Sequence, residues 1–144
     1  MPVFAGQSRE ELRRAYLDAW RRSSQGLPLS PLEDQIATVI VQHPEYHAWF
    51  ERGNTALTED FGLERGATNP FLHLGMHLAI REQAGTDRPP GIRAIHADLA
   101  SRCGGVLAAE HLMMEALGET LWESQRAGRA PDEQAYVERL RRLG

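Results

Sequence analysis

Histidines at helical spacing are the feature of this sequence that points most directly to chemistry. Three pairs of candidate metal ligands are each separated by four residues: His43 with His47, His73 with His77, and His111 with Glu115. Residues four apart on a helix project from one face, with Cβ atoms about 5–6 Å apart, so two such side chains can share one ion. Six histidines placed at random would give roughly a quarter of one such His–His pair, whereas this chain has two. The spacing therefore predicts a transition-metal site.

His73 and His77 are the strongest candidates, because both lie in a stretch that is expected to form a buried helix. A buried imidazole needs a hydrogen-bond partner or a metal ion, since an unsatisfied polar group costs about 1–3 kcal/mol. One interpretation is that the pair binds an ion. The alternative is that each ring bonds a backbone carbonyl or a carboxylate inside the core.

His111 and Glu115 form the natural second pair, because two helices that each supply two nitrogen or oxygen ligands can hold an ion in a helical bundle. Zinc would take such a set as a tetrahedron, whereas iron or manganese would favour more carboxylates and open positions. His47 is a candidate fifth ligand, and His43 ranks below it because Pro44 interrupts the helix between the two rings. The alternative is that His111 and Glu115 contact each other and merely satisfy their helix.

Other ionisable residues are expected to have structural roles. His96 lies among apolar residues and is expected to be a core histidine with a hydrogen-bond partner. Glu110 is expected at the surface, and the alternative is that it contacts a metal ligand from outside the site. Helical spacing places His111 near the middle of a buried face and Glu115 at its margin. The residues predicted to form that buried face are Leu107, Met114, Leu117, Gly118, Leu121 and Trp122.

Composition and motifs exclude several classes of function. A net charge of −4 and a pI near 5.9 argue against a nucleic-acid partner. The one cysteine, Cys103, allows neither an internal disulfide nor a cysteine-rich zinc site. The sequence has no His-Glu-x-x-His motif, Gly-rich phosphate loop or Gly-x-Ser-x-Gly elbow, so it identifies no reaction. With no signal peptide and no long apolar run, a cytoplasmic location without a membrane partner is expected.

Cap residues, prolines and glycines predict an all-α chain. The stretch 53–68 reads as a long loop, and the helices are expected after a cap at Ser8, from Pro31, over 44–52, over about 70–85, after Gly91, over 106–127 and after Pro131. Apolar side chains cover almost every direction of the 70–85 helix, so it is expected to be central and buried, with Gly75 admitting a close neighbour. We predict one domain, 1–144, a compact bundle of about six to seven helices around that helix.

Several segments together resemble one known family. Residues 68–83 (TNPFLHLGMHLAIREQ) look like its signature, and further similar segments are 27–29 (LPL), 87–92 (DRPPGI), 109–115 (AEHLMME), 122–126 (WESQR) and 131–133 (PDE). On these residues the chain is similar to an uncharacterised bacterial family, domain of unknown function 1841, from about Trp20 to Leu143. The resemblance implies no known activity and assigns no site residues.

Three hypotheses for the function follow from these observations. The first is a helical protein that binds a divalent transition metal, zinc or iron or manganese, through His73, His77, His111 and Glu115, with His47 as a fifth ligand. The second is a non-enzymatic interaction module with a buried histidine network and no metal, for which the partner is unknown and a homodimer is one form. The third is small-molecule binding in a His-lined pocket.

Overall fold

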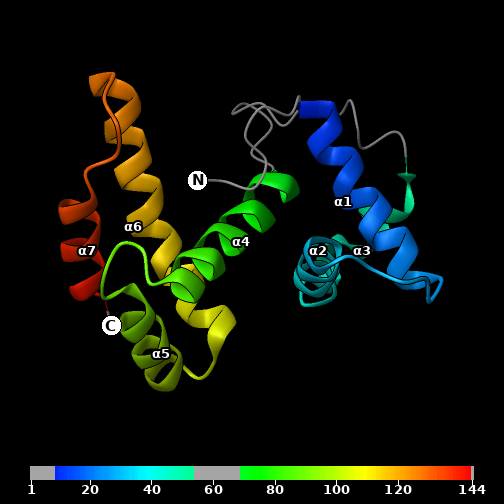
Figure 1. Cartoon of the computed structure of the whole chain (residues 1–144), viewed down its shortest axis with the longest axis horizontal. Coiled ribbons are helices and arrows are strands. Elements are labelled where there is room, and N and C mark those ends of the chain that lie inside the picture. Colours follow the sequence, from blue (N-terminus) through cyan, green and yellow to red (C-terminus); the bar gives the residue numbers. More distant parts are fainter. Residues whose placement is uncertain (1–8, 54–68, 144) are drawn as a thin grey trace. The chain divides into compact units, whose positions relative to one another are not determined.

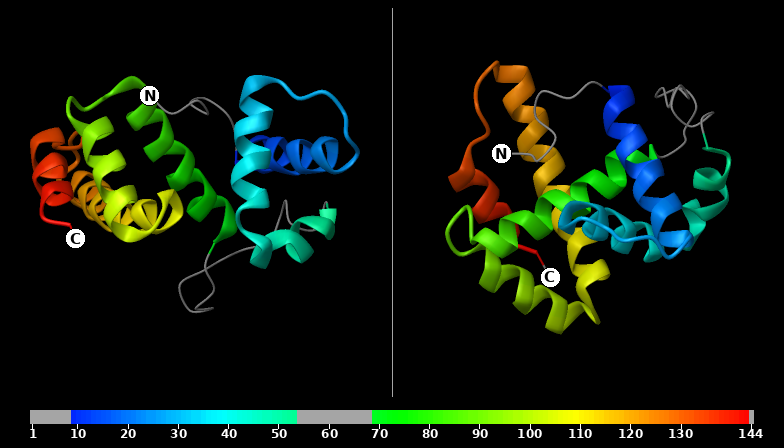
Figure 2. Two further views of the ribbon diagram at one scale, coloured as in Figure 1. Left: turned by 90° about the horizontal axis from the view of Figure 1, so that it is seen from below. Right: turned by 45° about the vertical axis from the view of Figure 1, so that its right-hand side comes forward.

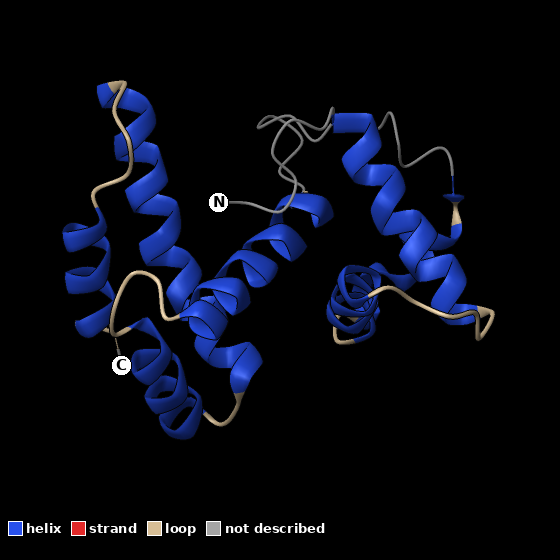
Figure 3. Cartoon of the chain, in the orientation of Figure 1, coloured by secondary structure: helices blue, strands red, loops and turns tan. Residues whose placement is uncertain are grey.

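The protein is all-α in the residues that this computed structural model describes, 9–53 and 69–143 (Figure 1). Figure 3 shows helices and loops without a strand in these ranges. The elements are α1 Arg9–Ser24, α2 Pro31–Val41, the 3-10 helix η1 Pro44–Tyr46, α3 His47–Glu51, α4 Pro70–Thr86, α5 Ile92–Cys103, α6 Val106–Ala127 and α7 Glu133–Arg141. The predicted fold class and the predicted number of helices are therefore confirmed. The predicted cap at Ser8 and most of the predicted loop 53–68 lie outside the described residues.

Local sequence signals explain where α2 and α4 begin. Ser30 and Glu33 form a capping box in which the Ser30 hydroxyl accepts from the Glu33 N–H at 3.1 Å, and the Glu33 carboxylate accepts from the Ser30 N–H at 2.8 Å. The Ser30 N–H bond favours the ionised form of Glu33 and lowers the pKa of its carboxyl group. Before α4, the Asn69 side-chain oxygen accepts from the Phe71 N–H at 3.0 Å. Both helices begin at the proline predicted from the sequence.

The contacts divide the chain into two compact units, Met1–Leu78 and Ala79–Gly144, and α4 contributes residues to both. The sequence predicted one domain, and that stays a prediction, because two compact units can belong to one domain. On α4, Leu74, His77 and Ile80 are fully buried, whereas Leu72 is 63% exposed. No helix in the described part of the chain is long and apolar enough to cross a bilayer.

The core of the first unit is aromatic and aliphatic. Figure 2 shows α1 and α2 crossing within this unit, and they are in direct contact. Phe71 of α4 enters this core, with its ring centroid 5.6 Å from Tyr16 and 4.7 Å from Trp49. The buried members are Tyr16, Ala19, Ile36, Val39, Ile40, Trp49, Phe50 and Leu74.

Tyr16 meets α4 at the glycine in its first half. A Cβ added to Gly75 would lie 3.5 Å from the Tyr16 hydroxyl oxygen, which is an ordinary van der Waals contact. The neighbour of Gly75 is thus a single side chain of α1, Tyr16. Position 75 has room for a methyl group. Burial raises the pKa of the Tyr16 hydroxyl, because the charged form would lose its hydration.

The second unit has its own core, in which α5, α6 and α7 are in contact. Tyr136 of α7 donates a hydrogen bond to the Gln83 side-chain oxygen at 2.7 Å and so ties α7 to the second half of α4. Burial raises the pKa of the Tyr136 hydroxyl. Large side chains that are buried in this unit include Ile80, Ile92, Leu99, Met113, Leu117 and Leu140.

The buried face of α6 differs from the predicted one. Trp122 is 55% exposed and Leu121 is 39% exposed, whereas Glu110 is fully buried. His111 and Glu115 are exposed, although the predicted face placed them inside it and at its margin. Met114 and Leu117 are buried as predicted, but the prediction was wrong for Leu121 and Trp122. Apolar type alone set the predicted face, whereas the structure also buries Glu110, in an ion pair with Arg81.

Candidate metal centre

The two histidines of α4 lie together, as their spacing predicted. The ring centroids of His73 and His77 are 4.9 Å apart, one helical turn from each other. His77 is fully buried, and His73 is partly buried. The helix thus presents two imidazoles from one face within the first unit.

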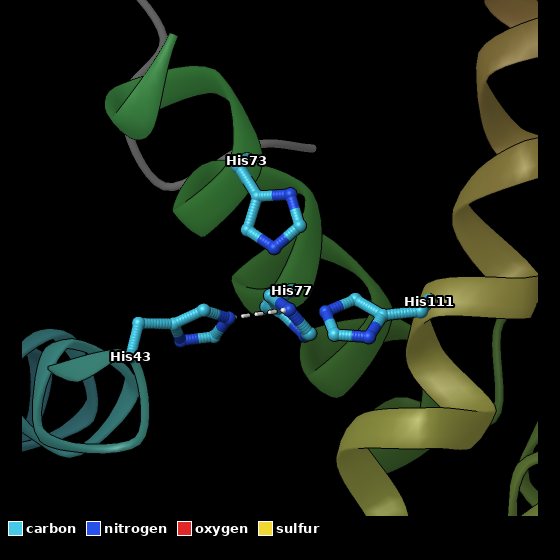
Figure 4. A group of neighbouring side chains, drawn as sticks. All are labelled: His43, His73, His77 and His111. Carbon is cyan, nitrogen blue, oxygen red and sulfur yellow. Dashed lines mark hydrogen bonds between the residues drawn. The ribbon is translucent and has the colours of Figure 1, made fainter. Parts of the chain in front are cut away.

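A third imidazole joins them from the end of α2. His43 is 2% exposed, and its Nε2 lies 3.1 Å from Nε2 of His77. Its ring centroid is 5.0 Å from that of His73 and 4.7 Å from that of His77. One nitrogen from each of these three rings lies within 4.8 Å of the others. Figure 4 draws the three side chains, together with His111 of the second unit. We call His43, His73 and His77 the histidine trio.

The backbone of α2 orients the His43 ring. Nδ1 of His43 donates to the carbonyl oxygen of Val39 at 2.8 Å, one turn earlier in the chain. Because this bond holds the proton on Nδ1, the lone pair of His43 is on Nε2, the atom that meets His77. Metal-binding histidines are commonly oriented in this way by a backbone carbonyl on the other ring nitrogen.

The contact between His43 and His77 suits either a proton or a metal ion. Without an ion, Nε2–H of His77 donates to Nε2 of His43 across the observed 3.1 Å. With an ion, two nitrogens on a tetrahedral zinc with bonds of about 2.0–2.1 Å would lie about 3.3 Å apart. The observed nitrogen–nitrogen separation lies within about 0.2 Å of that spacing.

Tyr46 forms one wall of the trio. Its ring stacks on His43 with an interplanar angle of 7° and a centroid distance of 5.7 Å, and it meets His73 edge-on at 6.0 Å. Burial, with a smaller contribution from the charge of Glu45, raises the pKa of the Tyr46 hydroxyl, so Tyr46 is neutral near pH 7. It therefore shields the trio without adding charge.

His47 is engaged outside the trio. Its Nε2 donates to the carbonyl oxygen of Ile40 at 2.8 Å, and its ring lies 4.6 Å from that of Trp20. The sequence argument ranked His47 above His43 because Pro44 separates them, but the structure brings His43 to the α4 pair. Pro44 itself was the available signal. It ends α2 and opens η1, so the chain turns at His43 and its ring folds back onto the last turn of α2.

A second polar cluster lies in the second unit, around Glu110. The Arg81 guanidinium contacts both carboxylate oxygens, with Nε–Oε1 at 3.1 Å and Nε–Oε2 at 3.2 Å. Nε2 of His96 donates to Oε2 at 2.9 Å. Glu110 is fully buried, so the prediction that it is a surface carboxylate was wrong, while His96 has the hydrogen-bond partner that was expected for it. We call these three residues the Glu110 cluster.

Comparison with known proteins identifies a family. The family described as Domain of unknown function (DUF1841) matches residues 8–142, which is nearly the whole chain. No curated protein and no solved structure shows significant similarity to it. The match agrees with the resemblance in segments such as 68–83, which carries two of the trio. This chain therefore belongs to the family described as Domain of unknown function (DUF1841).

Proposed function

We propose that this chain binds a divalent transition-metal ion through His43, His73 and His77. One observation carries the proposal: three imidazoles from two separate parts of the chain converge in the first unit, two of them almost completely buried. The carbonyl of Val39 further supports it, because it directs the lone pair of His43 toward His77. Imidazole nitrogens gathered at one point form a set of ligands for a cation.

The types of ligand favour zinc over harder ions. Imidazole suits zinc, copper, nickel and iron, whereas magnesium, calcium and manganese prefer carboxylate and carbonyl oxygens. The trio offers nitrogen ligands alone, so manganese is the least favoured of the ions considered from the sequence, and iron stays the alternative to zinc. The proposal assigns no reaction to the ion.

The sequence prediction that α6 adds ligands is part of the proposal. A tetrahedral zinc has one position more than the trio fills. The spacing of His111 and Glu115 predicts both as ligands, and we propose that one of them takes this position. If neither does, a water molecule or another small ligand takes that position, and the ion has the open site that hydrolytic zinc centres use.

Elemental analysis of protein purified without an affinity tag tests the proposal. We expect close to one equivalent of zinc or iron after metal addition and removal of the excess. The variant His43→Ala should lose the ion, and the matched control His47→Ala should keep it, because Nε2 of His47 is bonded to Ile40. Less than about a tenth of an equivalent of any transition metal, unchanged by metal addition, would exclude the site.

The other two hypotheses predict different results from the same preparation. An interaction module without metal would contain no ion, and His73→Ala would leave its metal content at zero. It would be isolated as a stable dimer or with a defined partner. A small-molecule site would show stabilisation by a ligand that persists in the presence of a chelator. Either result without bound metal would replace the proposal.

A further inference from the structure

The first half of α4 is held to α1, to α3 and to the link between α2 and η1 by two different sets of contacts. The apolar set is formed by Phe71, which meets Tyr16 and Trp49 edge-on, and by the fully buried Leu74. The polar set is the histidine trio, in which His77 bonds His43 directly. The apolar set is fixed by the sequence, whereas the strength of the polar set depends on what lies between the imidazoles.

An ion in the trio would join segments that are distant in the chain. His43 lies two positions after the end of α2, and His73 follows 30 positions later, since 73 − 43 = 30. The three ligands lie together only when α4 is docked against the end of α2, so an ion would bind the docked form in preference to the open one. A ligand that binds one form alone shifts the equilibrium by a factor of 1 + [L]/Kd.

We infer that metal occupancy of the trio controls how firmly the first half of α4 is docked in the first unit. This inference rests on the proposed function, and it assigns the ion a role: a clip whose strength follows the supply of free metal. Without metal, the N–H···N bond between His77 and His43 and the apolar contacts of Phe71 hold the helix. With metal, each ligand bond must break before α4 can leave.

The effect is expected to be local. The second unit has its own core, which includes Leu99, Met113 and Leu140, and its own buried ion pair between Arg81 and Glu110. Amides in α7 therefore serve as an internal reference within the same molecule, measured in the same sample.

Native-state hydrogen exchange of the full chain tests the inference, with zinc alone as the probe. The rates are compared in chelator and at free zinc equal to 100 times the measured Kd. We expect amides of residues 74–78 and of the last turn of α2 to exchange about 100-fold more slowly with zinc, because 1 + 100 is about 100. Amides of α7 should change by less than about twofold.

Two variants make the result specific. His43→Ala should abolish the zinc-dependent protection of residues 74–78, whereas His47→Ala should retain it. If His43→Ala fails to fold, the wild-type comparison between residues 74–78 and α7 carries the test alone, because it needs no variant.

The possible failures can be told apart. If zinc binds in one equivalent but residues 74–78 exchange at the same rate as in chelator, the clip is wrong and the metal site stands. If zinc slows α7 as much as residues 74–78, the effect is global and the local clip is again wrong. If no zinc binds, the proposed function fails and the clip fails with it.

Discussion

Two buried histidine environments in this chain differ in what completes them. In the Glu110 cluster, His96 and Arg81 surround one fully buried carboxylate, and the positive guanidinium balances its negative charge. In the histidine trio, the contact between His43 and His77 brings two ring nitrogens together at 3.1 Å. The first arrangement is complete with protein groups. In the second, one imidazole faces another, and this is where the proposed metal ion would bind.

The difference shows why histidine spacing alone is a weak guide to function. His96 reads from the sequence as an isolated histidine among apolar residues, and it is used to satisfy a buried acid. His77 reads as one of a pair, and it meets a third ring from another part of the chain. The role of each ring therefore depends on its partner in the packed structure, which the spacing along the chain does not give.

The largest expected effect concerns the stability of the Glu110 cluster. Glu110→Ala should lower the free energy of unfolding by about 3–5 kcal/mol, because it leaves a partly buried guanidinium without its partner. Urea denaturation followed by circular dichroism measures the change, and metal stoichiometry should stay the same. A loss below about 1 kcal/mol would mean that water replaces the carboxylate easily, and the contrast between the two environments would weaken.

The next largest effect concerns metal affinity. His77→Ala should weaken zinc binding by at least about 100-fold, because losing a ligand should cost no less than losing a group that merely orients one. The matched control is His96→Ala, the same substitution in the Glu110 cluster, which should leave zinc affinity unaltered. Competition with a chromophoric chelator measures both values. Equal losses in the two variants would show that zinc affinity reports general destabilisation.

A smaller effect is expected from the residues that the sequence predicts on α6. His111→Ala or Glu115→Ala should weaken zinc binding by about tenfold or more if the residue is a ligand. Both side chains are exposed, so neither change should disturb the core of the second unit. The same competition titration distinguishes the two variants. Wild-type affinity in both would limit the protein ligands to the trio.

The smallest expected effect distinguishes the stability of α4 from the zinc affinity of the trio. Gly75→Ala should raise the free energy of unfolding by about 0.5–1 kcal/mol, because alanine favours the helix and the added methyl group meets the Tyr16 hydroxyl at an ordinary distance. Zinc affinity should not change, since Gly75 lies on another face from the trio. Thermal denaturation in chelator measures the gain. A destabilised variant would show that Tyr16 cannot accommodate the methyl group.

Local signals were sufficient for most of the secondary structure. Ser30 with Glu33 and Asn69 with Pro70 set the starts of α2 and α4, because a cap depends on groups within three residues. The spacing of His73 and His77 likewise placed both on one face. The fold class and most of the helix bounds follow from such short-range rules.

The sequence placed His43 below His47 as a candidate ligand, because the contact of His43 with α4 joins distant parts of the chain. Pro44 was interpreted as directing this ring away from its neighbours, whereas the turn it forces brings the ring to α4. Nothing within one helical turn of His43 encodes that α4 passes there. The position of His43 in the trio is therefore set by the packing of its segment against α4 within the first unit.

By itself, the sequence determined the helices, their caps and the shared face of His73 and His77, because backbone hydrogen bonding and side-chain periodicity act over a few residues. Tertiary structure alone decided that His43 joins that pair and that Glu110 is buried with Arg81 and His96. The physical reason is that a buried polar group must be matched by a partner, and the chain brings that partner from 34 positions away for His43 and 29 for Glu110. No pattern within one segment specifies which distant segment that will be.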